Sequence, residues 1–447
     1  QAISKALDKY DADWMTIMVA NAKTGAILAS STYPTFDPNL RDMTNYLDYN
    51  ISYAYEPGST MKIFSYMATM ENGEYNGSEK YTSGVYKTKD GTEIGDWLRS
   101  GWGKITYDQG FALSSNVGVI NLINKHLNGN LLMDYYKKLG FGSKTNIELA
   151  NEVSGKLAFK YETEVFNAGF GQGITTTPIQ NIKALTSISN NGTLLQPYII
   201  DKIVDQNTGK VIYKGEKKEL EKVASTETVS KIKNLMESVI NGNSKTSTGY
   251  YYYMDGYDII AKTGTAQVAR ESGKGYYSNQ VIRGFAGMFP KDNPEVIMYV
   301  AAKNPSSIKL MSEVVKEIVK NTSNYLGIYN GKKEENKNLK ETKRITNEEK
   351  ETFLNSIKNS PEKKISLLAD FVDSGFCYVS DGAKTLKVPF IEIKEILENE
   401  KIKKCVYEIK TILSNIKEIA EIKGVISDVQ LSSYILDSSR KHDLNTQ

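Results

Sequence analysis

A serine and a lysine one helical turn apart could carry out covalent chemistry in this chain. Ser59 and Lys62 lie directly after Pro57-Gly58, which breaks the chain, and before the apolar run Ile63-Phe64-Ser65-Tyr66-Met67-Ala68-Thr69-Met70. We expect a helix from Ser59 to about Asn72, in which the two residues share a face. A lysine held against an apolar helix loses its preference for the charged form and can accept a proton from a serine. The spacing therefore predicts a nucleophile, Ser59, and its base, Lys62.

The Ser-x-x-Lys spacing is common, so the surroundings must distinguish this pair from the others. The same spacing occurs at Ser230/Lys233, Ser306/Lys309, Ser360/Lys363, Ser414/Lys417 and Ser438/Lys441. We interpret those pairs as solvated surface, because they lie in charged stretches of the sequence. Ser59 instead falls on a first helical turn, where free backbone N–H groups and the positive end of the helix dipole favour a developing negative charge.

A second polar motif, Ser114-Ser115-Asn116, follows a predicted helix through Phe111-Ala112-Leu113. A bend at this point could aim the Ser114 hydroxyl and the Asn116 amide into one cleft. The alternative is a helix cap or a turn, because Ser and Asn are the usual residue types there.

A third motif, Lys262-Thr263-Gly264-Thr265, follows a predicted strand from Tyr257 to Ala261. The same Lys-Thr-Gly triplet occurs earlier, from Lys23 to Gly25, where we predict only a hairpin turn. The Gly-rich stretch Asn167 to Gly173 lacks the Gly-Lys-Ser/Thr ending of a phosphate loop. We expect it to form a tight turn at the edge of a cleft.

Length and composition limit the classes of function. A chain of 447 residues with 40% hydrophobic and 24% charged residues is typical of a soluble protein with two or three domains. A net charge of +3 does not point to nucleic acid or to an anionic membrane. The two histidines and two cysteines are too scattered for a metal cluster, so we expect no metal and no cofactor.

No apolar run is long enough to span a bilayer, and no signal peptide is visible. The chain opens on Gln1 in what looks like the middle of a protein, so we expect an anchor or leader to be missing from this sequence.

The elements that would position these motifs follow from hydrophobic patterning. We predict a domain over residues 1–330, a charged linker over 331–345 and a small domain over 346–447. Within the first domain we predict helices over 1–13 and 312–325, and strands over 14–19, 26–29, 257–261, 284–289 and 296–302, the last three as an antiparallel meander.

The three motifs, in this order, resemble those of the penicillin-recognising serine acyl transferases. Their flanks resemble the transpeptidase domain of class B, monofunctional penicillin-binding proteins, over roughly residues 10–330. The matching stretches are Ser31-Thr32-Tyr33-Pro34 with Phe36-Asp37-Pro38-Asn39, Glu56 to Thr60, Ser114 to Gly118, Gly171-Gln172-Gly173 through Gln180, and Lys262 to Gln267. One departure is Ala261, where the family usually has glycine. The resemblance implies an α/β (α+β) fold with a central antiparallel sheet flanked by helices, and a helical subdomain that holds the active site.

The resemblance also implies roles for the catalytic residues. Ser59 would attack the carbonyl of the penultimate D-Ala of a peptidoglycan stem pentapeptide, and Lys62 would take its proton. Ser114 would relay a proton to the leaving D-Ala, and Asn116 would hold the substrate's amide side chain or backbone. The backbone amides of Ser59 and Thr265 would form the oxyanion hole.

For substrate binding, the resemblance implies that Lys262 supplies positive potential and that Thr263 and Thr265 bind the terminal carboxylate. Gly264 would let the substrate backbone lie against the strand as an added edge. The expected enzyme is a serine-type D,D-transpeptidase with chemistry like that of D-Ala-D-Ala carboxypeptidases. An amine from a neighbouring stem would resolve the acyl-enzyme into a cross-link.

The expected ligands and surroundings come from the same resemblance. β-Lactams would acylate the serine, and a glycosyltransferase in the membrane would be a partner through the missing N-terminal region. No nucleic acid is expected. The implied location is the outer face of the bacterial cytoplasmic membrane. A role in septation, elongation or sporulation is left open.

Two other functions on the same fold are alternatives. A β-lactamase would need a base for a deacylating water, and we find no Glu-x-x-Leu-Asn element between the second and third motifs. A β-lactam sensor would resemble a different branch, which lacks the stretch from Gly171 to Gln180.

Residues 346–447 resemble the 3′–5′ exonuclease-like domain of bacterial DNA polymerase I, and only faintly. The resemblance involves Ile396 to Lys404, Val406 to Lys410, Gly424 to Asp428 and Tyr434 to Asp437. The first acidic pair that such a nuclease needs is not evident, and the chain stops before the last acidic position. We therefore expect an inert or truncated module.

Overall fold

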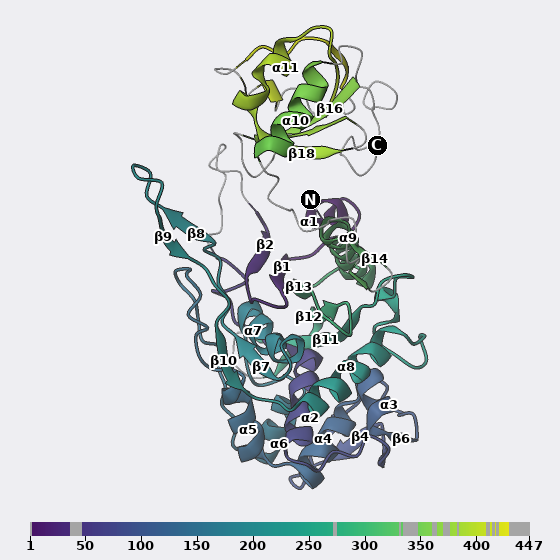
Figure 1. Cartoon of the computed structure of the whole chain (residues 1–447). Helices are drawn as coiled ribbons and strands as arrows, with labels where there is room; N and C mark the ends of the chain where they lie inside the picture. The colour runs from purple at the N-terminus through teal and green to yellow at the C-terminus, as the bar shows by residue number, and fades with distance from the viewer. Residues whose placement is uncertain are drawn as a thin grey trace. The chain divides into compact units, whose positions relative to one another are not determined.

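The computed structural model describes residues 2–35, 47–270, 275–329, 332–333, 347–359, 364–369, 376–381, 384–407, 412–413, 416 and 420–428. The chain divides into two units, Gln1–Glu335 and Asn336–Gln447, which are described separately below (Figure 1). Phe36 to Asn39 and most of the predicted linker lie outside the described residues.

A five-stranded antiparallel sheet forms the centre of the first unit. Its order is β11-β12-β13-β1-β2, so β11 is an edge strand. The strands are β1 Trp14–Asn21, β2 Ile27–Tyr33, β11 Ile260–Ala269, β12 Tyr276–Phe289 and β13 Val296–Lys303.

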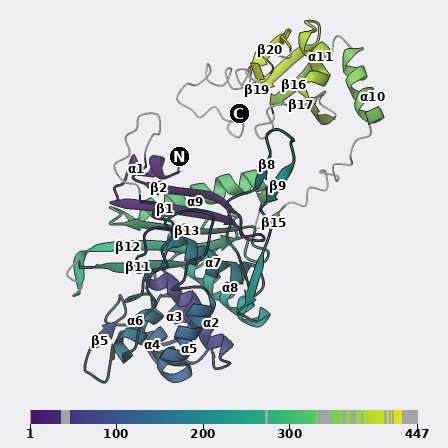
Figure 2. The same ribbon diagram turned by 90° about the vertical axis from the view of Figure 1, so that its left-hand side faces the viewer.

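Both faces of this sheet are covered, because successive side chains of a strand point to opposite faces. In β1, Met15, Ile17 and Val19 pack with α1 (Ala2–Leu7) and α9 (Ile308–Leu326), whereas Met18 and Ala20 pack into the core of the helical part. Figure 2 shows α9 on one side of the sheet and α7 and α8 on the other. The prediction of a central antiparallel sheet flanked by helices is confirmed.

The helical part is built around α2 (Lys62–Glu71), which is buried from Lys62 through Met70. A helix that is buried on all sides must be packed by other elements all round. The surrounding helices are α3 Tyr107–Ala112, α4 Asn116–His126, α5 Gly129–Lys138, α6 Glu162–Gly169, α7 Pro178–Ser189 and α8 Thr226–Ile240. The predicted helix after Ser59 is confirmed, with its first turn as the 3-10 segment η1 (Gly58–Met61).

Short elements complete the first unit. The two-stranded pairs are β3 Lys80–Thr82 with β6 Lys104–Thr106, β4 Val85–Lys87 with β5 Glu93–Gly95, β7 Thr193–Leu195 with β10 Glu219–Lys222, β8 Lys202–Val204 with β9 Val211–Lys214, and β14 Ile328–Tyr329 with β15 Lys332–Lys333. The 3-10 segment η2 spans Tyr250–Tyr252. Within the described ranges, no helix is long and apolar enough to cross a membrane.

Several predicted boundaries are wrong. β12 begins at Tyr276, eight residues before the predicted start at 284, and β2 ends at Tyr33, four residues after the predicted end at 29. β11 begins at Ile260 and continues to Ala269, so the third motif lies inside the strand and not after it. Polar residues and Gly264 hide its alternating pattern in the sequence. α1 ends at Leu7, because the chain beyond it turns to pair Asp13 N–H with the carbonyl of Lys303. α9 begins four residues earlier than predicted, where the Ser307 side chain caps it.

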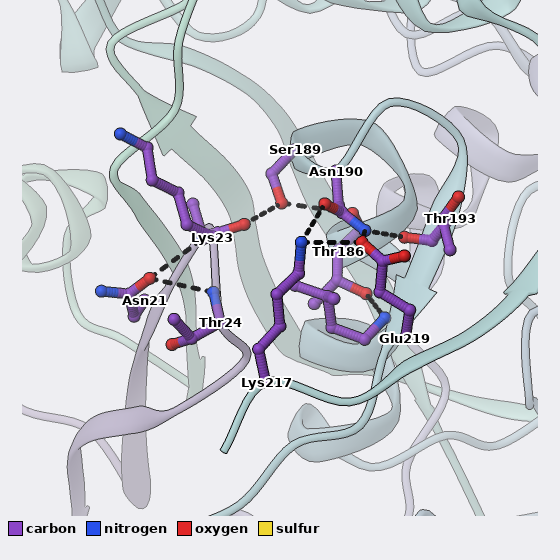
Figure 3. A network of polar contacts seen from close by, with 11 residues as sticks. Asn21, Lys23, Thr24, Thr186, Ser189, Asn190, Thr193, Lys217 and Glu219 are labelled. Carbon is purple, nitrogen blue, oxygen red and sulfur yellow. Dashed lines mark hydrogen bonds and ion pairs between the residues drawn. The ribbon is translucent and has the colours of Figure 1, made fainter.

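The earlier Lys-Thr-Gly triplet is a hairpin turn, as predicted. Asn21 Oδ1 accepts hydrogen bonds from the N–H groups of Lys23 and Thr24, at 2.9 and 3.1 Å. Ser189, near the end of α7, donates to the carbonyl of Ala22 at 2.7 Å. Figure 3 shows this turn beside a polar network that continues through Asn190. The Ser189 contact joins the β1–β2 turn to α7, and the Asn190 contacts join the end of α7 to Thr193 and Glu219.

The second unit has its own mixed sheet of order β18-β17-β16-β19-β20. β16 pairs antiparallel with β17 and parallel with β19. Its elements are α10 Asn347–Lys358, β16 Lys364–Ala369, β17 Phe376–Ser380, β18 Thr385–Pro389, η3 Phe390–Ile393, α11 Lys394–Glu398, β19 Lys403–Tyr407 and β20 Val425–Asp428. Buried residues from Phe353 to Ile416 form a core separate from those of the first unit.

Because each unit has a core of its own, we predict that a chain ending at Arg344 keeps the unfolding transition of the first unit. Differential scanning calorimetry of the full and shortened chains measures this. The shortened chain should lose only the transition of the second unit. A fall of more than about 4 °C in the remaining transition, roughly 1–2 kcal/mol for domains of this size, would show that the second unit supports the first.

Candidate active site

Ser59 lies in the 3-10 turn η1, one turn before Lys62. Its backbone carbonyl accepts a hydrogen bond from the Lys62 N–H, which fixes the turn onto α2. The Thr60 hydroxyl donates to the carbonyl of Pro57 at 3.0 Å. Among the residues that the structure describes, the half-exposed Ser59 hydroxyl has no hydrogen-bond partner. The predicted nucleophile is therefore free to meet a ligand.

Glycines allow three segments of backbone to meet at this turn. The Gly58 N–H donates to the carbonyl of Gly171 at 3.0 Å, and a Cβ on Gly171 would lie 2.1 Å from the Gly58 oxygen. On the other side, a Cβ on Gly58 would lie 2.9 Å from the carbonyl oxygen of Thr265 in β11. A Cβ on Gly264 would lie 3.0 Å from the Pro57 oxygen. The close approach of η1, the Gly171 turn and β11 therefore requires glycine.

The amino group of Lys62 is fully buried. It donates to the Ser114 carbonyl at 2.5 Å, to Asn116 Oδ1 at 2.8 Å and to Ser114 Oγ at 3.3 Å. Burial lowers the pKa of Lys62 from its ordinary value to about 7, and the negative charge of Asp96 opposes this shift. Near neutral pH the amine is therefore present in both protonation states, as a general base requires.

The second motif holds a bend at Ser114, whose φ of +59° lies in the left-handed region. This conformation costs a residue with a side chain about 1–2 kcal/mol. The helix-cap alternative applies to the middle residue, because Ser115 Oγ accepts from the N–H of Gly118 and caps α4. Ser114 and Asn116, on either side of the cap, both reach Lys62. Their expected convergence is observed.

Sequence reasoning missed Asp96. This buried carboxylate accepts hydrogen bonds from Ser115 Oγ at 2.9 Å, from Val117 N–H at 3.0 Å and from Gly84 N–H at 2.8 Å. It thus anchors the cap that places the second motif. Nothing in the sequence distinguishes it from a surface turn residue, because its partners are 12 to 21 residues away.

Lys262 approaches the same hydroxyl from β11. Its fully buried amino group donates to Ser114 Oγ at 2.9 Å and to the carbonyl of Thr263 at 3.0 Å. Burial and the nearby charge of Lys62 hold its pKa well below the ordinary value. The Ser114 hydroxyl therefore lies between two buried amines, an arrangement that can pass a proton.

The two threonines of the third motif lie on the opposite face of β11 from Lys262, since side chains alternate along a strand. Thr263 Oγ1 is 2.8 Å from Thr248 Oγ1, and Thr265 is exposed. The structure thus brings Lys62, Ser114, Asn116 and Lys262 into direct contact. The close backbone approach at Gly58 places Ser59, Gly264 and Thr265 beside this group of side chains.

Comparisons with known proteins agree on the first unit. Residues 15–324 match the family model of the penicillin binding protein transpeptidase domain. The chain is 35% identical over 329 residues to stage V sporulation protein D of Bacillus subtilis, covering 71% of this chain and 50% of that protein. It is 29% identical to penicillin-binding protein PbpB of Mycolicibacterium smegmatis, covering 68% and 48%. The chain thus spans about half the length of these curated relatives.

Solved structures share the fold. Penicillin-binding protein 2X from Streptococcus thermophilus superposes with a TM-score of 0.66 at 29% identity, covering 72% of this chain and 50% of that one. Penicillin-binding protein 3 from Mycobacterium tuberculosis, in complex with aztreonam, superposes with a TM-score of 0.68 at 24% identity, covering 74% and 77%.

A second family model, for the ribonuclease H-like domain of DNA polymerase I, matches residues 358–446, in line with the faint resemblance predicted for the tail. The first match covers most of the chain and includes all three motifs. This chain belongs to the penicillin-binding protein transpeptidase domain family.

Proposed function

We propose that this chain is a peptidoglycan D,D-transpeptidase that works through an acyl-enzyme on Ser59. The observation that carries the proposal is the free Ser59 hydroxyl, one turn before a buried lysine whose pKa is about 7. The name of a relative from Neisseria meningitidis, probable peptidoglycan D,D-transpeptidase PenA, supports the same reading at 28% identity. The substrate would be a stem pentapeptide that ends in D-Ala-D-Ala.

In the proposed first step, Ser59 Oγ attacks the carbonyl carbon of the penultimate D-Ala while neutral Lys62 takes the hydroxyl proton. As the peptide bond breaks, the terminal D-Ala leaves as an amine and needs a proton. The Ser114 hydroxyl can pass one on, because it contacts the amines of both Lys62 and Lys262. Asn116 Oδ1 holds Lys62 in place, and Asn116 Nδ2 donates to the carbonyl of Gly95 at 3.0 Å. The second N–H of this amide would orient substrate.

In the second step, an amine of a neighbouring stem attacks the ester, forms the cross-link and returns the proton to Ser59. Release of the acyl group to water would be a carboxypeptidase reaction, which is a different activity and does not form part of this proposal.

Substrate binding in this proposal uses the free edge of β11. An edge strand presents unpaired N–H and C=O groups, so an extended peptide can add to it as a further strand. Gly264 offers no side chain to obstruct that approach. Thr263 and Thr265 hydroxyls would bind the terminal carboxylate. The contact between Gly58 and the Thr265 carbonyl keeps the Ser59 and Thr265 amides near each other, which supports their proposed role as the oxyanion hole.

The proposed location is the outer face of the cytoplasmic membrane, with a glycosyltransferase as partner. Both rest on the family resemblance. A β-lactamase on this fold remains the alternative, and a chromogenic cephalosporin distinguishes the two: the transpeptidase should give one burst of product per protein molecule, whereas rapid sustained hydrolysis would favour the β-lactamase.

Ser59 should be the sole site of penicillin acylation, because it combines a free hydroxyl with a neighbouring buried base. Peptide mass spectrometry after penicillin treatment should place the adduct on Ser59, and Ser59→Ala should carry none. Ser230→Ala removes the serine of a surface pair with the same spacing and should react normally. An adduct on Ser230 or Ser306 would overturn the assignment.

Lys62→Met should lower the acylation rate by about 100- to 10,000-fold, the usual cost of removing a general base, while leaving the fold intact. Met fills the volume of the lysine stem without a base. Stopped-flow acylation and the melting temperature check both points. Lys233→Met, in the pair with the same spacing on α8, should leave the acylation rate unchanged, although Lys233 is half-buried and donates to the carbonyl of Asp292. Near wild-type rates in Lys62→Met would require a different base.

Gly171→Ala should reduce acylation by about 100-fold or more, because the new Cβ would displace the turn that carries Ser59. Gly173→Ala is the matched control: its φ of +73° is close to the +81° of Gly171, but no atom lies within 4 Å of the added Cβ. Because both variants carry similar backbone strain, only Gly171→Ala should lower the acylation rate by more than a few-fold. Equal losses would mean that strain, and not the Gly58 contact, matters.

A further inference from the structure

Arg283 in β12 lies directly opposite Thr265 in β11. Side chains of directly opposed residues in an antiparallel pair lie on the same face, with Cβ atoms about 5 Å apart. The next such pair along the strands is Thr263 with Phe285. Arg283 is therefore on the face of the sheet that presents Thr263 and Thr265, next to the exposed Thr265. Figure 1 shows β11 and β12 side by side.

The Arg283 side chain lacks the partners that such a group normally has. Its Nε is buried and makes no hydrogen bond, and in the part of the chain that the structure describes no carboxylate forms an ion pair with it. Most buried polar groups are hydrogen-bonded, and an unpaired cationic one is costly. The positive charge of Arg283 acts on the buried Tyr252, because it opposes the rise in the pKa of Tyr252 that burial causes. A bound anion would supply the partner that this guanidinium lacks.

Lys262 is poorly placed to be the only cation for a carboxylate at the threonines. Its amino group is buried on the other face of β11 and is already bonded to Ser114 Oγ and to the Thr263 carbonyl. Burial beside Lys62 also reduces the fraction of Lys262 that is charged. An arginine, in contrast, stays protonated in proteins and presents a planar fork of N–H donors that fits a carboxylate.

We propose that Arg283 is a specificity-determining residue that binds the terminal carboxylate of the ligand together with the hydroxyl of Thr265. This inference rests on the proposed function and adds a second cation to it. The guanidinium does not enter the covalent step. It holds the carboxylate, and so sets how often a bound ligand presents its carbonyl to Ser59. Its contribution should depend on the ligand's negative charge and weaken with ionic strength.

The test compares Arg283→Gln and Arg283→Lys with Arg270→Gln as the matched control. Arg270 is an exposed arginine on the same hairpin, and its Nε donates to the backbone carbonyl of Tyr276. The probes are benzylpenicillin and its methyl ester, which lacks the carboxylate charge, and the second-order acylation rate is measured with each. Arg283→Gln should lose about 10- to 100-fold with the acid, the effect of a charged hydrogen bond. It should lose less than about twofold with the ester.

Arg283→Lys should fall between wild type and Arg283→Gln, and Arg270→Gln should match wild type. Wild-type acylation by the acid should slow with added salt, and this dependence should largely disappear in Arg283→Gln. Equal losses with acid and ester would overturn the proposal and make Arg283 structural, and so would an unchanged rate with the acid. If neither wild type nor Arg270→Gln is acylated at Ser59 at all, the proposed transpeptidase function fails first, and this inference fails with it.

Discussion

The rest of the site depends on the hydrogen bonds that hold the buried amino group of Lys62. Placing a lysine inside a protein costs several kcal/mol unless its donors are satisfied. Here the acceptors are the carbonyl and hydroxyl of Ser114 and the amide oxygen of Asn116. To supply them, the chain takes a left-handed bend at Ser114, and the buried Asp96 carboxylate holds the helix cap beside it. Burial thus both positions the proposed base and brings its pKa near neutrality.

A second constraint fixes the backbone around Ser59, the proposed nucleophile. The turn that carries Ser59 is held between the Gly171 turn and β11, at distances that leave no room for side chains on Gly58 or Gly171. The two constraints act on the same helix, since α2 begins directly after that turn. The helical part fixes Lys62 and the sheet fixes Ser59. A few backbone contacts thereby join β11, the proposed ligand-binding strand, to the helix that begins with Lys62.

The sequence predicted what depends on local pattern. The Pro57-Gly58 break and the apolar run after Lys62 indicated the central helix, and a family resemblance supplied the central antiparallel sheet. Asp96 could not be predicted, because its role depends on partners 12 to 21 residues away that only the fold brings together. Arg283 could not be predicted for the same reason: its position opposite Thr265 is set by strand register. The extent of β11 was misjudged because this strand carries polar residues and a glycine, which interrupt the alternation of apolar and polar residues that marks a strand in the sequence.

The central claim, that Lys62 acts as the base in its neutral form, is tested most directly by the pH dependence of the acylation rate. Because burial depresses the pKa to about 7, the second-order rate with a penicillin should be low below about pH 6, rise through a single transition near 7 and level off above about pH 8. A rate that is flat across this range, or that rises only near the ordinary pKa of lysine, would contradict the account.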